Sequence, residues 1–146
     1  MKYLILILTM LFLSINLFGQ VQNFRDIPND ILEHLDKMGV DNSPLLNCYE
    51  SAYFNVIFEK SRKNFDFTDK RIGLITGSSG KTRSDKASYF KLEKDRFNRN
   101  YSPNGGTLYI FDAAQKEESG GYDVAIVYWS KFLISVKDVV KRLKGK

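Results

Sequence analysis

Residues 107–129, TLYIFDAAQKEESGGYDVAIVYW, contain two strongly apolar segments separated by a polar stretch. In the apolar segments, 107–111 and 122–129, both alternating faces are hydrophobic, which is typical of strands that are covered on both sides. The polar stretch, 113–121, ends in Ser-Gly-Gly and predicts either a long hairpin loop or a short helical turn. Two buried strands are therefore the centre of the predicted fold.

A third strand is predicted at residues 72–75, and it runs directly into a glycine-rich turn. Glycine and serine between a strand and a helix can aim several backbone N–H groups at an anion, and Lys81 adds a positive charge. A nucleotide phosphate loop is excluded, because its first glycine would fall at Ile75. A plain flexible turn is the simpler interpretation, since turns favour these residues in any case. The hypothesis to be tested is an anion site made by Gly77, Ser78, Ser79, Gly80, Lys81 and Thr82.

Two helices are predicted before these strands. The first begins around Pro28 and ends at Gly39, and its apolar residues recur at helical spacing. The second begins at Ser43-Pro44, a capping residue followed by proline, and carries an aromatic stripe suited to packing on a sheet. The apolar positions are Ile27, Ile31, Leu35 and Met38 in the first helix, and Leu45, Tyr49, Ala52, Tyr53, Val56 and Ile57 in the second.

Two further helices are predicted after the glycine-rich turn. One follows the capping residue Ser84, and the other closes the chain. Their apolar positions are Tyr89, Phe90, Leu92 and Phe97 in the former, and Val136, Val139, Val140 and Leu143 in the latter. The whole series contains no repeat and no strict alternation of strand and helix. It favours an α+β fold, with helices packed on a small mixed β-sheet of three to four strands. A three-layer α/β sandwich is the alternative, because strands buried on both faces need cover on each side.

The first 19 residues have the organisation of a cleavable signal peptide. Met1-Lys2-Tyr3 is a positive start, residues 4–18 are an almost unbroken apolar run, and Gly19-Gln20 offers a cleavage point. The run is shorter than the roughly 20 apolar residues of a spanning helix, which favours cleavage over an uncleaved anchor. We therefore predict a signal peptide at 1–19, a single α+β domain at 20–146 with no membrane span, and a periplasmic or secreted destination.

Composition sets the charge of this domain and the source of its stability. Removing residues 1–19 takes one lysine and no acid from 22 Lys and Arg and 17 Asp and Glu, which leaves a formal charge of +4. The only cysteine, Cys48, cannot form an internal disulfide, so stability must come from packing. Cys48 falls in an apolar helical pattern and is expected to be a buried small hydrophobe.

Basic residues gather after the glycine-rich turn and at the end of the chain. They could form a patch for acidic polymers. The interleaved acids Asp85, Glu93 and Asp95 favour instead a solvated helix face with i,i+4 ion pairs. The basic residues are Lys81, Arg83, Lys86, Lys91, Lys94, Arg96 and Arg99, followed by Lys137, Lys141, Arg142, Lys144 and Lys146.

Residues suited to catalysis are sparse. The only histidine, His34, is expected to be a partly exposed polar residue of the first helix. Carboxylate pairs such as Glu50 with Glu59, or Asp112 with Asp123, could serve as acid and base, but nothing in their spacing selects them. One histidine and one cysteine do not make a zinc or iron site, and the acids lack calcium-loop spacing. We predict no catalytic residues, no metal and no cofactor.

Two functions from different classes remain. We favour an exported binding or interaction domain that uses its basic, glycine-rich edge on an acidic glycan, a phosphate-bearing ligand or an acidic protein. Nucleic acid is not expected as a natural partner outside the cell. The alternative is an exported small hydrolase that acts through carboxylates. A binding surface is expected on loops 98–106 and 118–121, because loops can vary while the sheet stays fixed.

Overall fold

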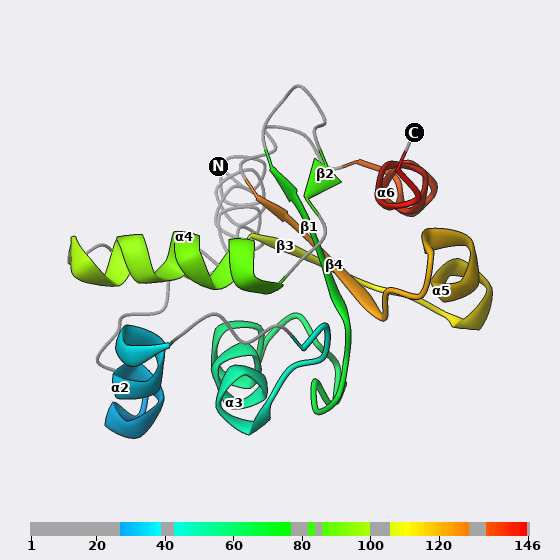
Figure 1. The fold of residues 1–146 in the computed structure, drawn as a ribbon. Helices are drawn as coiled ribbons and strands as arrows, with labels where there is room; N and C mark the ends of the chain where they lie inside the picture. Colours follow the sequence, from blue (N-terminus) through cyan, green and yellow to red (C-terminus); the bar gives the residue numbers. More distant parts are fainter. Residues whose placement is uncertain are drawn as a thin grey trace, which may run out of the picture.

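The structure of the protein is a computed structural model that describes residues 27–38, 43–76, 82–83, 86–99, 106–128 and 134–145. Across these residues the chain forms five helices packed on a small mixed sheet of four strands, so the predicted α+β fold is confirmed (Figure 1). Among the described helices, none has both the length and the apolar composition that crossing a membrane requires. The predicted signal peptide, 1–19, lies outside the described residues.

The sheet has the strand order β2-β1-β4-β3. Its strands are β1 (Ile72–Thr76), β2 (Thr82–Arg83), β3 (Thr107–Ile110) and β4 (Val124–Tyr128). The two central strands run parallel, with Ile72 opposite Val124 and Thr76 opposite Tyr128. The edge strands β2 and β3 are antiparallel to their neighbours. The carboxyl ends of β1 and β4 therefore lie at the same end of the sheet, where β3 begins.

Helices cover both faces of the sheet (Figure 1). On one face lie α2 (Asn29–Lys37), α3 (Cys48–Ile57) and α4 (Lys86–Asn98), and on the other α5 (Ala113–Ser119) and α6 (Val136–Leu143). The central strands alternate accordingly. Leu74 and Ile126 belong to the core under the first face, whereas Ile75 and Val127 belong to the core under the second. The layering is thus helix, sheet, helix, although strands and helices do not alternate strictly along the chain.

The two apolar segments 107–111 and 122–129, which contain β3 and β4, differ in burial. β4 is buried along its whole length, as its pattern predicts. The expectation that residues 107–111 are covered on both faces is wrong for β3, because Thr107 is exposed and Leu108, Tyr109 and Ile110 are only half-buried. Among the described strands, β3 lies at the edge of the sheet and has a neighbour on one side only. Its apolar sequence does not distinguish an edge from the centre of the sheet.

Three helices bury the residues that their periodicity predicts. Those residues are Ile31 and Leu35 in α2, Tyr89 and Phe90 in α4, and Val139, Val140 and Leu143 in α6. The stretch predicted as a loop or helical turn forms α5, which Asp112 caps by accepting a hydrogen bond from the Gln115 backbone N–H at 2.8 Å. The predicted end at Gly39 and cap at Ser84 lie outside the described residues.

α3 begins at Cys48, so the predicted start at Ser43-Pro44 is wrong. A capping box fixes the true start. The Asn47 side chain accepts a hydrogen bond from the Glu50 N–H at 2.9 Å, and Glu50 Oε2 accepts one from the Asn47 N–H at 2.7 Å. Both donors are backbone groups that the first helical turn would otherwise leave unpaired.

The buried face of α3 also differs from the predicted aromatic stripe. It consists of Glu50, Ser51, Tyr53 and Phe54. Tyr49, expected in the core, is 42% exposed, and Cys48, expected to be a buried small hydrophobe, is an exposed free thiol. The reason is that the first turn is anchored by Glu50, whose side chain turns inward to Lys86 and leaves the two preceding residues facing outward.

Candidate functional site on helix α4

The glycine-rich turn starts at the carboxyl end of β1. Residues 77–81 lie outside the described residues, and Thr82 begins β2, where it pairs with Ile75. Both described ends of the turn therefore lie at the end of the sheet where β1 and β4 finish. In open α/β sheets, ligands bind outside the carboxyl ends of parallel strands. From β2 the chain continues into α4.

The two loops expected to share a binding surface join the sheet, at their described ends, on opposite sides of it along the strand direction. Gly106, which closes loop 98–106, adjoins the carboxyl end of β4, because a Cβ there would lie 2.8 Å from a backbone oxygen of that strand. In loop 118–121, the Gly120 carbonyl accepts a hydrogen bond at 3.0 Å from the guanidinium of Arg71, which precedes β1. Of these two loops, therefore, only loop 98–106 ends at the end of the sheet where β1 finishes.

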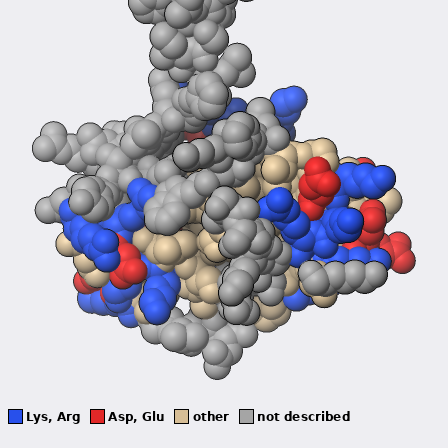
Figure 2. All heavy atoms as spheres, turned by 90° about the horizontal axis from the view of Figure 1, so that it is seen from above, with Lys and Arg blue, Asp and Glu red and all other residues tan. Residues whose placement is uncertain are grey.

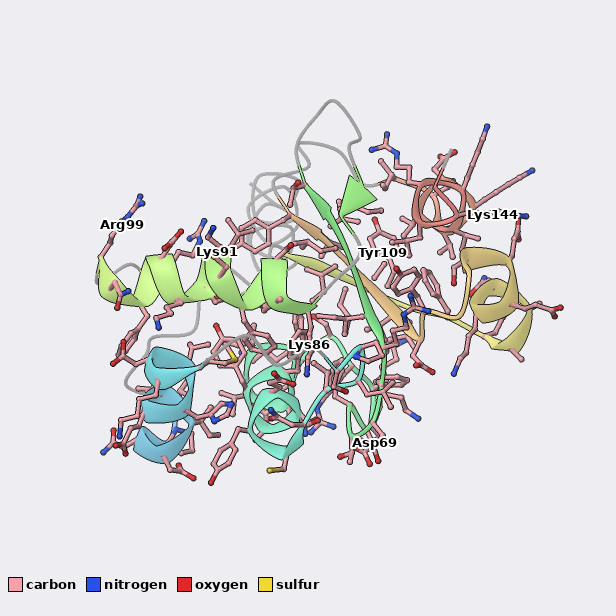
Figure 3. The ribbon with its side chains drawn as sticks, in the orientation of Figure 1. Asp69, Lys86, Lys91, Arg99, Tyr109 and Lys144 are labelled. Atoms are coloured by element: carbon pink, nitrogen blue, oxygen red, sulfur yellow. The ribbon has the colours of Figure 1, made fainter. Side chains whose placement is uncertain are left out.

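α4 turns Lys86 into the interior, so its expected place on a solvated helix face is wrong. The Lys86 Nζ donates to Glu50 Oε2 at 2.7 Å and to the Leu45 carbonyl at 2.6 Å. Lys86 is 3% exposed and Glu50 is 2% exposed. In Figure 3 the Lys86 side chain points from α4 toward α3. This cation binds the two helices together and is not available to a ligand.

Glu93 is also buried, contrary to its expected place among solvated acids. Its carboxylate accepts hydrogen bonds from the Tyr128 hydroxyl, at 2.6 Å, and from the Tyr53 hydroxyl. Burial raises the pKa of Glu93, and this effect outweighs the two hydroxyls and the nearby Arg96 charge, which lower it. Because the pKa is higher in the folded state, Glu93 favours folding most at low pH. That contribution is lost as the pH rises through the raised pKa.

Three buried tyrosines surround this carboxylate, namely Tyr53, Tyr89 and Tyr128. Burial, followed by the Glu93 charge, raises the pKa of each hydroxyl. The rings of Tyr89 and Tyr128 meet edge to face at 6.2 Å, and no described group hydrogen-bonds to the Tyr89 hydroxyl. The Arg96 guanidinium carbon lies 5.3 Å from the centre of the Tyr128 ring. The cluster joins α3, α4 and β4, with Arg96 half-buried at its edge.

The outward side of α4 carries two exposed cations that form no ion pair within the described part of the chain. Lys91 and Arg99 are exposed, and neither forms an ion pair with any residue that the structure describes. Figure 3 shows both on the side of α4 away from α2 and α3. Asp95, four residues from each, pairs with neither, so the i,i+4 pairs predicted for this helix are not found among its described residues. The i,i+4 pair in the described chain is Glu33–Lys37, on α2.

The carboxylates considered as acid and base pairs are either exposed or already engaged in the fold. Glu50 holds Lys86 and caps α3, while Glu59 is exposed. Asp112 caps α5, and Asp123 accepts a hydrogen bond from Lys116 at 2.6 Å. Across the described ranges, no three His, Cys, Asp or Glu side chains are grouped closely enough to hold a metal ion.

His34 lies on α2 and is half-buried, as predicted. Its ring stacks on Tyr49, with centroids 4.5 Å apart and 13° between the planes. Its Nε2 is buried and meets no hydrogen-bond partner in the part of the chain that is described. This stack connects α2 to α3.

Periodicity contained a signal for the inward charges of α4. Lys86, Tyr89, Phe90 and Glu93 are spaced by three, one and three, so both charged residues share the apolar face of the helix. The interpretation that placed all charged residues of the segment on a solvated face missed this signal.

A protein-family model described as a domain of unknown function, DUF8192, matches residues 42–145. The match includes α3 to α6 and all four described strands, whereas α2 precedes it. Comparison with curated proteins and with solved structures found no match. The buried charges and the outward cations of α4 all lie within the matched region.

Proposed function

We propose that this chain, which belongs to the DUF8192 family of domains of unknown function, is an exported binding domain for an anionic ligand or acidic partner. Its recognition surface is the α4 pair, defined as Lys91 and Arg99. The observation that carries the proposal is the sorting of charge on α4. Glu93 is turned inward, while the two cations remain exposed and have no ion-pair partner among the described residues.

Lys86 and Glu93 both turn inward, so one cation and one acid leave the surface of α4. The outer side keeps a net positive charge, to which the α4 pair contributes beside one exposed acid, Asp95. Arg99 can form two parallel hydrogen bonds to a carboxylate, sulfate or phosphate, and Lys91 adds a point charge. Exposed charges interact over about 8 Å at physiological ionic strength and less at higher salt. Binding at this surface is therefore expected to weaken as salt is added.

The glycine-rich turn is proposed as a second part of the same site. It connects the carboxyl end of β1, through β2, to α4. Backbone N–H groups of residues 77–81 and the Lys81 ammonium are the groups that would act on an anion. The support is the place of the turn in the chain, beside the end of the sheet that favours ligand binding.

Thermal unfolding of the purified protein with phosphate, sulfate, nucleotides, and acidic or neutral glycans, at two salt concentrations, tests the proposal. A selective ligand raises the unfolding midpoint by mass action. We expect a salt-sensitive rise with anions that is reduced when the α4 pair is changed to glutamine and when Lys81 is changed to alanine. The matched control replaces Lys60 and Lys63, exposed in the α3–β1 connection, by glutamine and should keep the rise. The absence of a shift with every anion would contradict the proposal.

Export is part of the proposal and rests on the composition of residues 1–19. Intact-mass measurement of protein recovered from the periplasm or the medium should give a chain that begins at Gln20. Recovery inside the cell of a chain that retains Met1 would contradict export without bearing on the α4 surface.

A second candidate function, hydrolysis through a carboxyl group, is favoured by one observation. The pKa of Glu93 is raised, as that of general acids often is, and three tyrosines surround this residue. Because Glu93 is fully buried, a substrate would have to displace part of the α4 packing to reach it. Turnover of a glycan that is lost on Glu93→Gln substitution, with an unchanged fold, would support this function. Retained turnover in that variant would exclude Glu93 as the acid.

A further inference from the structure

α6 carries a second group of exposed cations, on the other face of the sheet from α4. Lys137, Lys141 and Lys144 are spaced by four and three residues, so they lie along one side of the helix. All three are exposed, whereas Val139 and Val140 face the core. These three lysines are called the α6 stripe.

Local structure does not account for the α6 stripe. Like charges four residues apart destabilise a helix. The helix dipole favours cations near the carboxyl end but disfavours Lys137, which lies in the first turn. Of the nearby acids, Asp138 accepts a hydrogen bond from the Ser135 hydroxyl, and no described acid pairs with a lysine of the stripe. The stripe therefore has no ion-pair partner among the described residues, and its charges are available to an anionic partner outside the chain.

The α4 pair and the α6 stripe come from helices on opposite faces of one small sheet. Figure 2 looks onto the molecule from above, with the α4 side at the left and the α5 and α6 side at the right. Lys and Arg side chains lie on both sides, with Asp and Glu side chains among them, more of these at the right. A compact anion could contact one of these groups. Only an extended ligand could contact both together.

We infer that the ligand is a linear polyanion, of the chemistry of a sulfated or uronic-acid glycan, and that one chain contacts the α4 pair and the α6 stripe together. This inference rests on the proposed function and names its ligand class. Once the polymer is held at one helix, contact with the other is intramolecular and takes place at a high effective concentration. Affinity should therefore rise with polymer length until both helices are reached. Several ion pairs formed together also make binding steeply dependent on salt.

The experiment measures the Kd of heparin oligosaccharides of increasing length, with inorganic sulfate as the monomeric anion and phosphatidylglycerol vesicles as an anionic surface. Three variants of the full chain are compared. One changes the α4 pair to glutamine, the second changes the α6 stripe to glutamine, and the control changes Lys60 and Lys63. Circular dichroism and the unfolding midpoint verify that each variant is folded. We expect the first two variants to lose at least about tenfold in affinity for long chains, to lose the gain with length, and to show a shallower salt dependence.

The outcomes separate this inference from the function on which it rests. Loss of long-chain binding in the α4 variant, with unchanged binding in the α6 variant, would overturn the inference and leave the proposed function standing. Unchanged binding in both variants would overturn both. An affinity that does not depend on oligosaccharide length, or tighter binding to vesicles than to any oligosaccharide, would also refute a linear polymer as the ligand.

Discussion

Replacing Lys86 by methionine tests whether the buried ion pair holds α4 on α3. Methionine keeps most of the apolar stem but removes the ammonium, which leaves Glu50 charged and only 2% exposed. The Glu50 carboxylate then still accepts the hydrogen bond from the Asn47 N–H, but no positive charge compensates its negative charge. Removing one member of a buried ion pair costs about 3–5 kcal/mol. This is a large share of the roughly 5–15 kcal/mol that stabilises a small domain.

Urea unfolding followed by circular dichroism measures this loss. In a double variant that also carries Glu50→Gln, no buried charge remains, and the glutamine oxygen can still accept the hydrogen bond of the capping box. The double variant is therefore expected to regain about 1–3 kcal/mol over the single one. Lys37→Met, which breaks the exposed Glu33–Lys37 pair, is the control and should leave the unfolding midpoint unchanged. A loss below about 1 kcal/mol in Lys86→Met, or simple addition of the two substitutions, would refute the reasoning.

Three further substitutions test other contacts. Glu93→Gln should remove a pH dependence of the free energy of unfolding, because the raised pKa makes the wild type less stable as the pH rises above the ordinary glutamate value. Urea titrations between about pH 4 and 8 should show that the stability of the variant increases relative to that of the wild type as the pH rises. Gly73→Ala should cost about 1–3 kcal/mol by thermal unfolding, because a Cβ would lie 2.4 Å from Leu143 Cδ2, and Leu143→Val should reduce that cost. Gly106→Ala should lower the midpoint more than Gly120→Ala: both glycines have positive φ, but only the former would meet a neighbouring atom within 4 Å.

The elements that were predicted correctly are those whose signal lies within consecutive residues. The runs of apolar residues in β1 and β4 and the helical spacing in α2, α4 and α6 depend on no distant partner. The start of α3 failed although its signal was local. Ser43-Pro44 is a sequence that often starts a helix. Four residues later, however, Asn47 and Glu50 form the two reciprocal hydrogen bonds of a capping box, and the helix begins there instead.

The candidate site was predictable in composition but not in geometry. Its cations are evident in the sequence. Contacts between distant parts of the chain decide which charged side chains of α4 point into the core and which stay exposed. Lys86 is drawn inward by Glu50, 36 residues earlier, and Glu93 by Tyr53, 40 residues earlier. A one-dimensional pattern does not contain such pairings. For the same reason, β3 could not be assigned to the edge of the sheet before the strand order was known.

The parallel pairing of β1 with β4 also constrains when the protein can fold. Each residue of β1 meets its partner 52 positions later, so the centre of the sheet cannot close until most of the chain has left the ribosome. Contacts that join distant parts of a sequence form slowly, because the intervening chain must first be brought together. Until then the apolar side chains of α3 and α4 have no sheet to cover. The core on both faces of the sheet can therefore be completed only after β4, a late element of the chain, has been synthesised.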